Sequence, residues 1–277
     1  MVSAAGAPLS GHPLLPVDGH VHIHSCFELG AFFDSAARNF ARGAEPTPPL
    51  GVLLLTETFG TDRFAELEAA ADGARQIGGW RVAEGGEDGS LVLRRGHAPD
   101  LLILAGRQIV VRERLEVLAL CTRTAFRDGA GLEETLDRVR AAQGVPVVPW
   151  GFGKWWFGRG GIVADLLRTS SPGEFLLGDN GVRPLGTPSP RHFRMARTKG
   201  IGVLAGSDPL PFPAQALRPG HYGTLIPGEN FDPARPVSSL RQILPALPPG
   251  SPTFGRREPP HRFAEAQVRI RLGSSGC

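Results

Sequence analysis

The sequence predicts an α/β fold, either barrel-like or built on an open parallel sheet, and two observations support this class. The first is the recurrence of short apolar runs rich in Val, Ile and Leu, each closed by Gly or polar residues. The second is that segments with helical periodicity separate several of these runs. Because the runs are continuously apolar, we expect buried parallel strands with helices on both faces.

The elements are expected in the following order. Strands are predicted at Pro16–His22, Gly51–Glu57, Leu101–Val111, Leu115–Cys121, Val145–Trp150, Glu174–Asp179 and Ile201–Asp208. Helices are predicted at Thr61–Ile77, Leu132–Ala142, Ile162–Leu167 and Ser189–Lys199. The second helix shows the helical period clearly, since Leu132, Leu136 and Val139 fall on one face.

Two further segments depart from this alternation. Trp80–Glu84 and Ser90–Arg95 flank a turn rich in Gly and Asp, which predicts a small β-hairpin inserted in the fold. After Asp208 the chain is rich in proline, which has no backbone N–H to donate, so residues 209–236 are predicted to wrap the domain as a loop. Short helices are expected near Ser238–Leu244 and Phe263–Ile270.

Length and composition bound the function classes. A chain of 277 residues is sufficient for one large core, so residues 1–277 are expected to form a single domain, with its core at about 15–210 and an extension at 211–277. The net charge of +3 gives no basic field, so no nucleic-acid partner is expected, whereas a small anionic substrate or metabolite fits. No apolar run is long enough for a membrane helix. Three scattered cysteines and no recognisable secretory signal suggest reduced thiols and a cytoplasmic location.

The most specific local pattern is Asp18-Gly-His20-Val-His22 at the end of the first predicted strand. Side chains alternate along a strand, so His20 and His22 project to the same side and can share one metal ion. In α/β barrels the strand ends are also where active sites lie. Two hydrogen-bonded histidines in a polar mouth are the alternative interpretation.

Other polar residues occur at or within predicted strands. Asp208 ends the last strong strand, where its carboxylate can join two imidazoles as a hard ligand or can cap a turn before Pro209. Glu57 ends the second predicted strand, and Gln108 lies within the third. Glu116 lies inside an apolar run, where a carboxylate is costly to bury unless it is paired, coordinated or protonated, so either a role at the site or a salt bridge to an arginine is expected.

A loop that follows the fifth predicted strand concentrates three of the four tryptophans within residues 149–157. Together with Lys154 it can wall a pocket for an anion, or it can plug the end of the fold. Arg183 follows the next strand and can neutralise a phosphate or carboxylate. The sequence contains no phosphate-binding P-loop, dinucleotide fingerprint, serine nucleophile elbow or HExxH helix, which argues against those chemistries.

Taken in order, several motifs resemble those of the PHP (polymerase and histidinol phosphatase) superfamily over residues 15 to 210. They are His20-Val-His22, Thr56-Glu57-Thr58, Gly106-Arg107-Gln108, Glu116-Val117-Leu118, Val147-Val148-Pro149-Trp150 and Gly206-Ser207-Asp208. The resemblance implies a distorted seven-stranded β/α barrel with up to three metal ions at the carboxyl ends of the strands. It also implies phosphoester hydrolysis, the activity of most known enzymes of the family.

The chain departs from the family pattern at several metal-ligand motifs. Glu57 and Thr58 stand where the family has Asp-His, Gln108 where it has Glu, and Glu116 where a histidine is common. The Ala-His-Pro motif is replaced by Val148-Pro149-Trp150, and the closing histidine by Leu210. The resemblance therefore implies one ion on His20, His22 and Asp208, with Gln108 as a weaker ligand, in place of a trinuclear centre.

Two functions follow from these expectations. In the first, one divalent transition metal ion (Zn, Mn or Fe) activates water, and Glu57 or Glu116 transfers protons. Lys154 and Arg183 then receive an anionic substrate, preferably a small phosphoester, although C–N bond hydrolysis stays open. In the second, the chain is a catalytically inactive PHP-like domain that binds a metabolite or a protein partner, as the replaced ligands and the aromatic loop suggest.

Overall fold

The computed structural model of the chain describes residues 14–43, 49–73 and 75–272. Its strands are β1 (Leu14–Val21), β2 (Leu50–Leu55), β3 (Gln76–Ile77), β4 (Trp80–Glu84), β5 (Ser90–Arg94), β6 (Asp100–Leu104), β7 (Gly106–Val110), β8 (Glu116–Leu120), β9 (Val145–Pro149), β10 (Leu176–Asn180), β11 (Val203–Gly206), β12 (Tyr222–Pro227) and β13 (Thr253–Gly255). Its α-helices are α1 (Leu29–Gly43), α2 (Arg63–Asp72), α3 (Leu132–Ala141), α4 (Gly158–Thr169), α5 (Arg191–Lys199), α6 (Pro236–Ile243) and α7 (Pro260–Arg271), and two 3₁₀ turns are η1 (Pro213–Leu217) and η2 (Gly228–Asn230).

Two separate sheets organise these strands. One has eight strands in the order β13-β12-β1-β2-β6-β5-β4-β3, and the other has five in the order β11-β10-β9-β8-β7. The expected seven-stranded barrel is therefore wrong, although the α/β class holds. The predicted hairpin is present as β4 and β5, but β5 also pairs with β6 and so extends the larger sheet.

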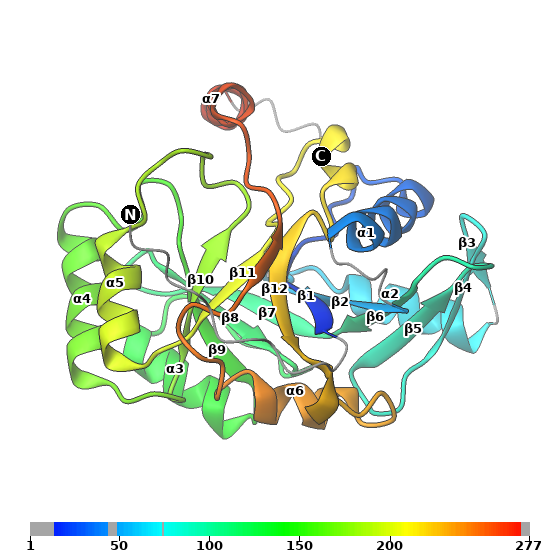
Figure 1. The fold of residues 1–277 in the computed structure, drawn as a ribbon, viewed down its shortest axis with the longest axis horizontal. Helices are drawn as coiled ribbons and strands as arrows, with labels where there is room; N and C mark the ends of the chain where they lie inside the picture. The colour runs from blue at the N-terminus through cyan, green and yellow to red at the C-terminus, as the bar shows by residue number, and fades with distance from the viewer. Residues whose placement is uncertain (1–13, 44–48, 74, 273–277) are drawn as a thin grey trace, which may run out of the picture.

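Three apolar clusters form the core in layers. One lies between the sheets and includes Val52 and Leu54, while Leu53 and Leu55 of the same strand belong to the cluster under α1 and α2. The third joins the five-stranded sheet to α3, α4 and α5, which cover its outer side (Figure 1). Alternate side chains of β2 pack on two opposite faces, and both faces are buried. The sequence of β2 is therefore apolar throughout.

The apolar run predicted as one strand at Leu101–Val111 is two strands in different sheets. β6 pairs with β2 and β7 pairs with β8, so the chain changes sheet at Ala105 and Gly106. A side chain at Gly106 would overlap the carbonyl oxygen of Leu55, which explains why glycine stands at the crossing. This change of sheet is the main reason why the strands do not follow the expected barrel order.

The prediction that residues 209–236 wrap the domain without a strand is also wrong. β12 lies within this segment and pairs antiparallel with β1 on one side and with β13 on the other. Its prolines flank or end the strand, and Pro227 is the last residue. Proline at such a position removes no interior ladder bond. The two C-terminal helices appear close to their predicted positions, as α6 and α7.

Backbone hydrogen bonds connect the two sheets at one edge. Asp208 N donates to His20 O at 2.8 Å, joining the chain after β11 to β1. Glu57 N donates to Gly106 O at 3.2 Å, and Gln108 N donates to Glu57 O at 2.8 Å. Five residues singled out from the sequence therefore lie on or beside the line where the sheets meet.

Within the described ranges, no helix combines the length and apolar character needed to cross a membrane.

The cysteines differ from the expectation of reduced thiols, because Cys26 is disulfide-bonded. Cys121 is a free thiol, and burial raises its pKa to about 12, so it stays protonated and unreactive.

Candidate metal centre

β1 supplies the two histidines that the sequence pattern predicted. His20 lies in the strand and His22 follows its last residue, and the two residues are 3% and 8% exposed, respectively. Close approach of β11 positions this end of β1, since a side chain at Gly206 would overlap the backbone nitrogen of His20. Glycine at position 206 therefore allows the last strand before Asp208 to reach the histidines.

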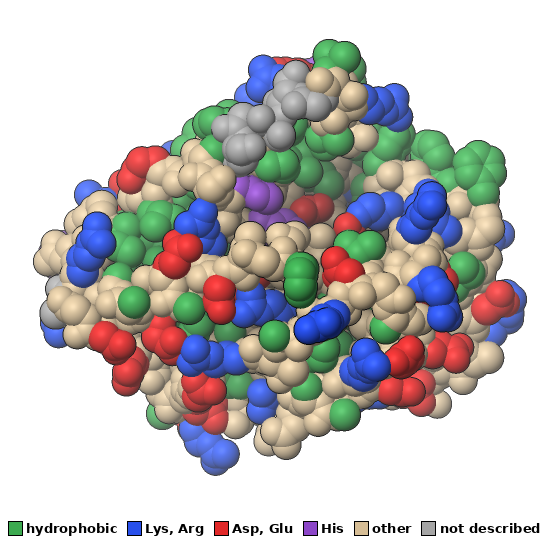
Figure 2. Space-filling view, turned by 180° about the vertical axis from the view of Figure 1, so that it is seen from behind, with side chains coloured by type: hydrophobic (Ala, Val, Ile, Leu, Met, Phe, Trp, Pro, Cys, Tyr) green, Lys and Arg blue, Asp and Glu red, His purple; other side chains and the backbone are tan. Residues whose placement is uncertain are grey.

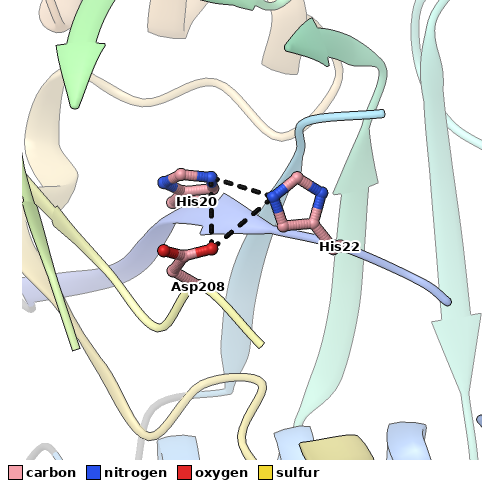
Figure 3. Close-up of side chains that lie close together, drawn as sticks. All are labelled: His20, His22 and Asp208. Carbon is pink, nitrogen blue, oxygen red and sulfur yellow. Dashed lines mark hydrogen bonds and ion pairs between the residues drawn. The ribbon is translucent and has the colours of Figure 1, made fainter. Parts of the chain in front are cut away.

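His20, His22 and Asp208 point toward one another (Figure 3). The Nε2 atoms of the two histidines are 3.0 Å apart, and Asp208 Oδ1 lies 3.5 Å from His20 Nε2 and 3.6 Å from His22 Nε2. One ligand atom from each residue lies within 4.8 Å of the others. Figure 2 shows histidine side chains in a hollow of the surface. The predicted convergence of these three residues is thus present, and together they could hold a metal ion.

Asp208 adopts a left-handed backbone conformation, with φ at +49°. Among residues other than glycine, Asp and Asn tolerate this region best, and it is otherwise sparsely populated. The backbone N–H of Asp208 is bound to His20 O, so a main-chain hydrogen bond holds the turn in which the carboxylate meets the histidines. A strained aspartate held in this way is typical of functional sites.

Gln108 brings a fourth donor atom to the cluster. Its Oε1 lies 3.2 Å from His20 Nε2, and its Nε2 donates to Glu116 Oε1 at 3.3 Å. The same Glu116 oxygen accepts from Lys154 Nζ in an ion pair. Glu116 is therefore compensated by a lysine, whereas the sequence analysis expected an arginine, and it fixes the amide so that its oxygen faces the histidines.

Asn180 orients the centre from the side of β10. Its Oδ1 lies 3.2 Å from His20 Nδ1, and its Nδ2 donates to Asp208 Oδ2 at 2.8 Å and to Trp150 O at 2.7 Å. Such contacts fix the orientation of a ligating imidazole. Asn180 was not among the candidates named from the sequence, and it is the last residue of a buried strand. Its signal was its position at a strand end beside the other candidates.

The protonation states suit a cation. Burial, followed by the charge of His20, lowers the pKa of His22 to about 3, so its imidazole is neutral at pH 7. Burial alone would raise the pKa of Asp208, but His20, His22 and Lys154 outweigh it and the net pKa is lowered. Neutral imidazole and ionised carboxylate are the forms that bind metal ions.

Asp18, two residues before His20, holds the surrounding backbone. It is fully buried and accepts hydrogen bonds from Ser207 N and Gly220 N, both at 2.8 Å, and from His20 N at 3.3 Å. Burial raises its pKa to about 6, against the lowering effect of these donors. Asp18 belonged to the motif quoted from the sequence, yet its structural role depends on the distant Gly220, which spacing does not reveal.

Two other candidates are engaged elsewhere. Glu57 accepts hydrogen bonds from the backbone N–H groups of Arg63 and Phe64 at the start of α2, and it pairs with Arg107 at 3.1 Å. Burial raises the pKa of Glu57, partly offset by Arg107. Arg183 is 6% exposed and forms two hydrogen bonds of 2.7 Å to the carboxylate of Asp179. Both side chains thus have structural partners.

Comparisons with known proteins bear on the fold. The chain matches no protein-family profile and no curated protein sequence. Among solved structures it is similar to PsfC from Pseudomonas syringae PB-5123, with a TM-score of 0.58 and 13% identity, over 94% of this chain and 98% of that one. It also has partial likeness to a lesion-specific endonuclease from Pyrococcus furiosus, with a TM-score of 0.41 and 11% identity, over 77% of this chain and 52% of that one.

A further likeness, with a TM-score of 0.40 and 13% identity, is to Endonuclease Q in complex with a 27-mer duplex that carries an abasic lesion, over 77% of this chain and 53% of that one. The presence of nucleic-acid enzymes among the similar structures contradicts the expectation that nucleic acid is excluded as a partner, and we withdraw it. At these identities the likenesses concern the fold alone. Over nearly all of its length, the chain shares the fold of PsfC.

Proposed function

We propose that this chain is a divergent member of the PHP superfamily and a metal-dependent hydrolase that acts on a small phosphoester. The observation that carries the proposal is the convergence of His20, His22 and Asp208 from both sheets onto one point. Resemblance of the opening and closing motifs to the family supports the same assignment. We propose further that residues 1–277 work as one domain.

The donor set fits one divalent transition ion such as Zn²⁺, Mn²⁺ or Fe²⁺. Two imidazoles and a carboxylate are ligands that suit these ions, and Gln108 adds an amide oxygen. When bound, such an ion supplies Lewis acidity and activates water at neutral pH. Three strong protein ligands leave room for water or substrate, as catalytic sites require.

The remaining residues position and balance this centre. Asn180 holds the His20 ring and the Asp208 carboxylate, and Glu116 holds the Gln108 amide. Glu116 is favoured over Glu57 as the group that transfers protons, because its carboxylate is hydrogen-bonded to the side chain of Gln108, whereas Glu57 meets Gln108 only through its backbone carbonyl. Both cations are ion-paired, Lys154 with Glu116 and Arg183 with Asp179. Lys154 is favoured as the cation that receives an anionic substrate, because its side chain is 35% exposed and its charge acts on Asp208, whereas the side chain of Arg183 is buried.

Metal content and hydrolysis test the proposal together. Protein purified without chelator is expected to carry about one equivalent of transition metal by plasma mass spectrometry, and the His20→Ala/His22→Ala variant is expected to carry none. Phosphoester hydrolysis should disappear in the same variant. His97→Ala is the matched control, because His97 is exposed and distant in sequence from the centre. Turnover that survives in the double variant would contradict the proposal.

Binding without turnover is the second candidate function, and one observation favours it. Both candidate proton-transfer carboxylates are already paired, Glu57 with Arg107 and Glu116 with Lys154. A domain of this kind would bind a metabolite through the aromatic loop. Under this function, metal-loaded protein should show no hydrolysis, while its tryptophan fluorescence should change with a metabolite from a screened panel.

A further inference from the structure

A cavity of about 420 Å³ lies between the loop after β9 and the segment that joins β10 to α5. Its volume falls in the usual range for small-molecule sites, which are largely apolar with a few polar groups. No residue of the metal centre lines it, so it is a separate site. Four aromatic side chains form much of its wall: Trp150, Phe152, Trp155 and Trp156.

The cavity meets the solvent at the aromatic loop. Trp156, which lines it, is 49% exposed, and the adjacent Phe157 is 94% exposed. Phe157 has φ at +56° and ψ at −139°, a conformation that a bulky side chain rarely adopts. Backbone strain of this kind costs about 1–3 kcal/mol and clusters at ligand-binding sites. The strained loop thus holds large rings at the mouth of the cavity, where a ligand can enter.

The charges that line the cavity are all positive. Two arginines, Arg183 and Arg191, belong to the lining, and no carboxylate does among the residues that the structure describes. Arg183 is 6% exposed and forms two hydrogen bonds of 2.7 Å to Asp179, so its charge is balanced and out of reach of a ligand. Arg191 is exposed and forms no ion pair within the described ranges. The cavity therefore offers one available positive charge.

The other hydrophilic side chains of the lining, Thr187 and His192, are already engaged with the backbone. Thr187 Oγ1 donates to Pro184 O at 2.6 Å, and His192 Nε2 donates to Gly160 O at 2.8 Å. Burial lowers the pKa of His192, so its imidazole is neutral at pH 7 and adds no charge. Charge recognition in the cavity is thus left to Arg191.

Two helices begin beside the cavity and add to its positive potential. α4 starts two residues after Trp156, and α5 starts at Arg191. Neither helix has an acidic residue in its first turn or a side-chain cap. Because the N-terminal end of a helix carries partial positive charge, both helices favour an anionic ligand and oppose a cationic one, although aromatic rings alone would suit either.

We propose that this cavity binds a small aromatic carboxylate, with its ring among the aromatic side chains and its carboxylate on the guanidinium of Arg191. Aromatic walls favour a planar ring through stacking and edge contacts. A guanidinium binds a carboxylate through two parallel hydrogen bonds, and one available cation balances a single negative charge. The inference does not depend on hydrolysis at the metal centre, so its test is separate from that of the proposed function.

Calorimetric titration of the metal-free chain tests binding with three probes. They are 2-naphthoate, 2-naphthamide, which has the same ring without the charge, and acetate, which has the carboxylate without the ring. 2-Naphthoate is expected to bind about tenfold more tightly than 2-naphthamide, the effect of one charge-assisted hydrogen bond, and acetate should show no binding at the same concentrations. An amide that binds as tightly as the carboxylate would overturn the inference.

Two variants separate the charge from the ring system. Arg191→Met should lower the affinity for 2-naphthoate about tenfold and leave that for 2-naphthamide unchanged. Its matched control is Arg197→Met, which removes the same charge from an exposed position in the last turn of α5 and should change neither. Trp156→Ala should weaken both probes, whereas Phe59→Ala, which removes an exposed ring outside the lining, should weaken neither. Equal loss of both probes in Arg191→Met would contradict the assigned role of Arg191.

Added Zn²⁺ distinguishes the cavity from the metal centre, since a carboxylate is itself a metal ligand. The affinity for 2-naphthoate should be the same with and without Zn²⁺, and the same in the His20→Ala/His22→Ala variant. Affinity that depends on Zn²⁺ would place the carboxylate at the metal centre and overturn the inference. If the chain binds no metal while 2-naphthoate binds as expected, the hydrolase proposal fails and this inference stands.

Discussion

The buried pair of Arg183 and Asp179 offers the sharpest test of how this structure uses its charges. The two side chains are 7% and 10% exposed, and they share two hydrogen bonds of 2.7 Å. Arg183→Met keeps the length of the side chain and removes the charge, leaving the Asp179 carboxylate with the Tyr222 hydroxyl at 2.9 Å. Removing one partner of a buried pair typically costs about 3–5 kcal/mol. For a chain of this size that corresponds to a melting temperature lower by roughly 5–9 °C.

Thermal and urea unfolding followed by circular dichroism measure this effect. Adding Asp179→Asn to Arg183→Met should recover part of the loss, because the unpaired charge is then gone. Arg191→Met is the matched control, since Arg191 lines the same surface cavity as Arg183 but is itself exposed. This variant should change the free energy of unfolding by less than about 0.5 kcal/mol. An Arg183→Met protein as stable as the wild type would refute the reasoning and return Arg183 to the role of a free anion-binding residue.

Three other perturbations have defined outcomes. Burial, followed by the charges of neighbouring arginines, lowers the pKa of His221 to about 4. As the pH falls from about 6.5 to 4, the imidazole of His221 therefore becomes protonated in the unfolded chain and not in the folded one. The free energy of unfolding should fall in that window. His221→Gln should flatten that part of the pH dependence of urea unfolding, and an unchanged slope would contradict the cause given. Gln108→Leu should weaken Zn²⁺ binding by about tenfold in a dye competition assay, while unaltered affinity would remove Gln108 from the centre. Gly206→Ala should destabilise the protein by about 1–3 kcal/mol, whereas Gly161→Ala, which meets no neighbour within 4 Å, should not; equal stability of both variants would rule out the close approach at His20.

Local rules made it possible to predict from the sequence that His20, His22 and Asp208 lie together. His20 and His22 are two residues apart on a strand, and the period of a strand alone places them on one side. Asp208 could be paired with them because the carboxyl ends of parallel strands meet at one edge. Gln108 became a ligand candidate because of the family resemblance, and in the structure its side-chain oxygen lies beside His20.

Long-range contacts explain what the sequence did not predict. The predicted barrel was wrong because the apolar run at residues 101–111 gives no sign that the chain changes sheet at Gly106. Glycine is needed there because the backbone of Leu55 lies too close for a side chain, and this contact is distant in sequence. Proline content hid β12, whose prolines flank or end the strand and leave its pairing with β1 intact. Asn180 was not predicted as part of the centre, since its partners His20 and Asp208 come from other parts of the chain.

The origin of the ligands has a consequence for how the chain unfolds. His20 and His22 belong to the end of β1 in the larger sheet, and Asp208 follows β11 in the smaller one. An ion bound at this point would connect the two sheets, and its ligands are far apart in the sequence. In this respect it would act as a covalent cross-link does. A ligand that binds only the folded state stabilises it in proportion to the logarithm of its concentration, so loading with metal should raise the stability of the whole domain. Because the sheets also share the apolar cluster between them, chelation should lower the midpoint of a single unfolding transition and not split it into two.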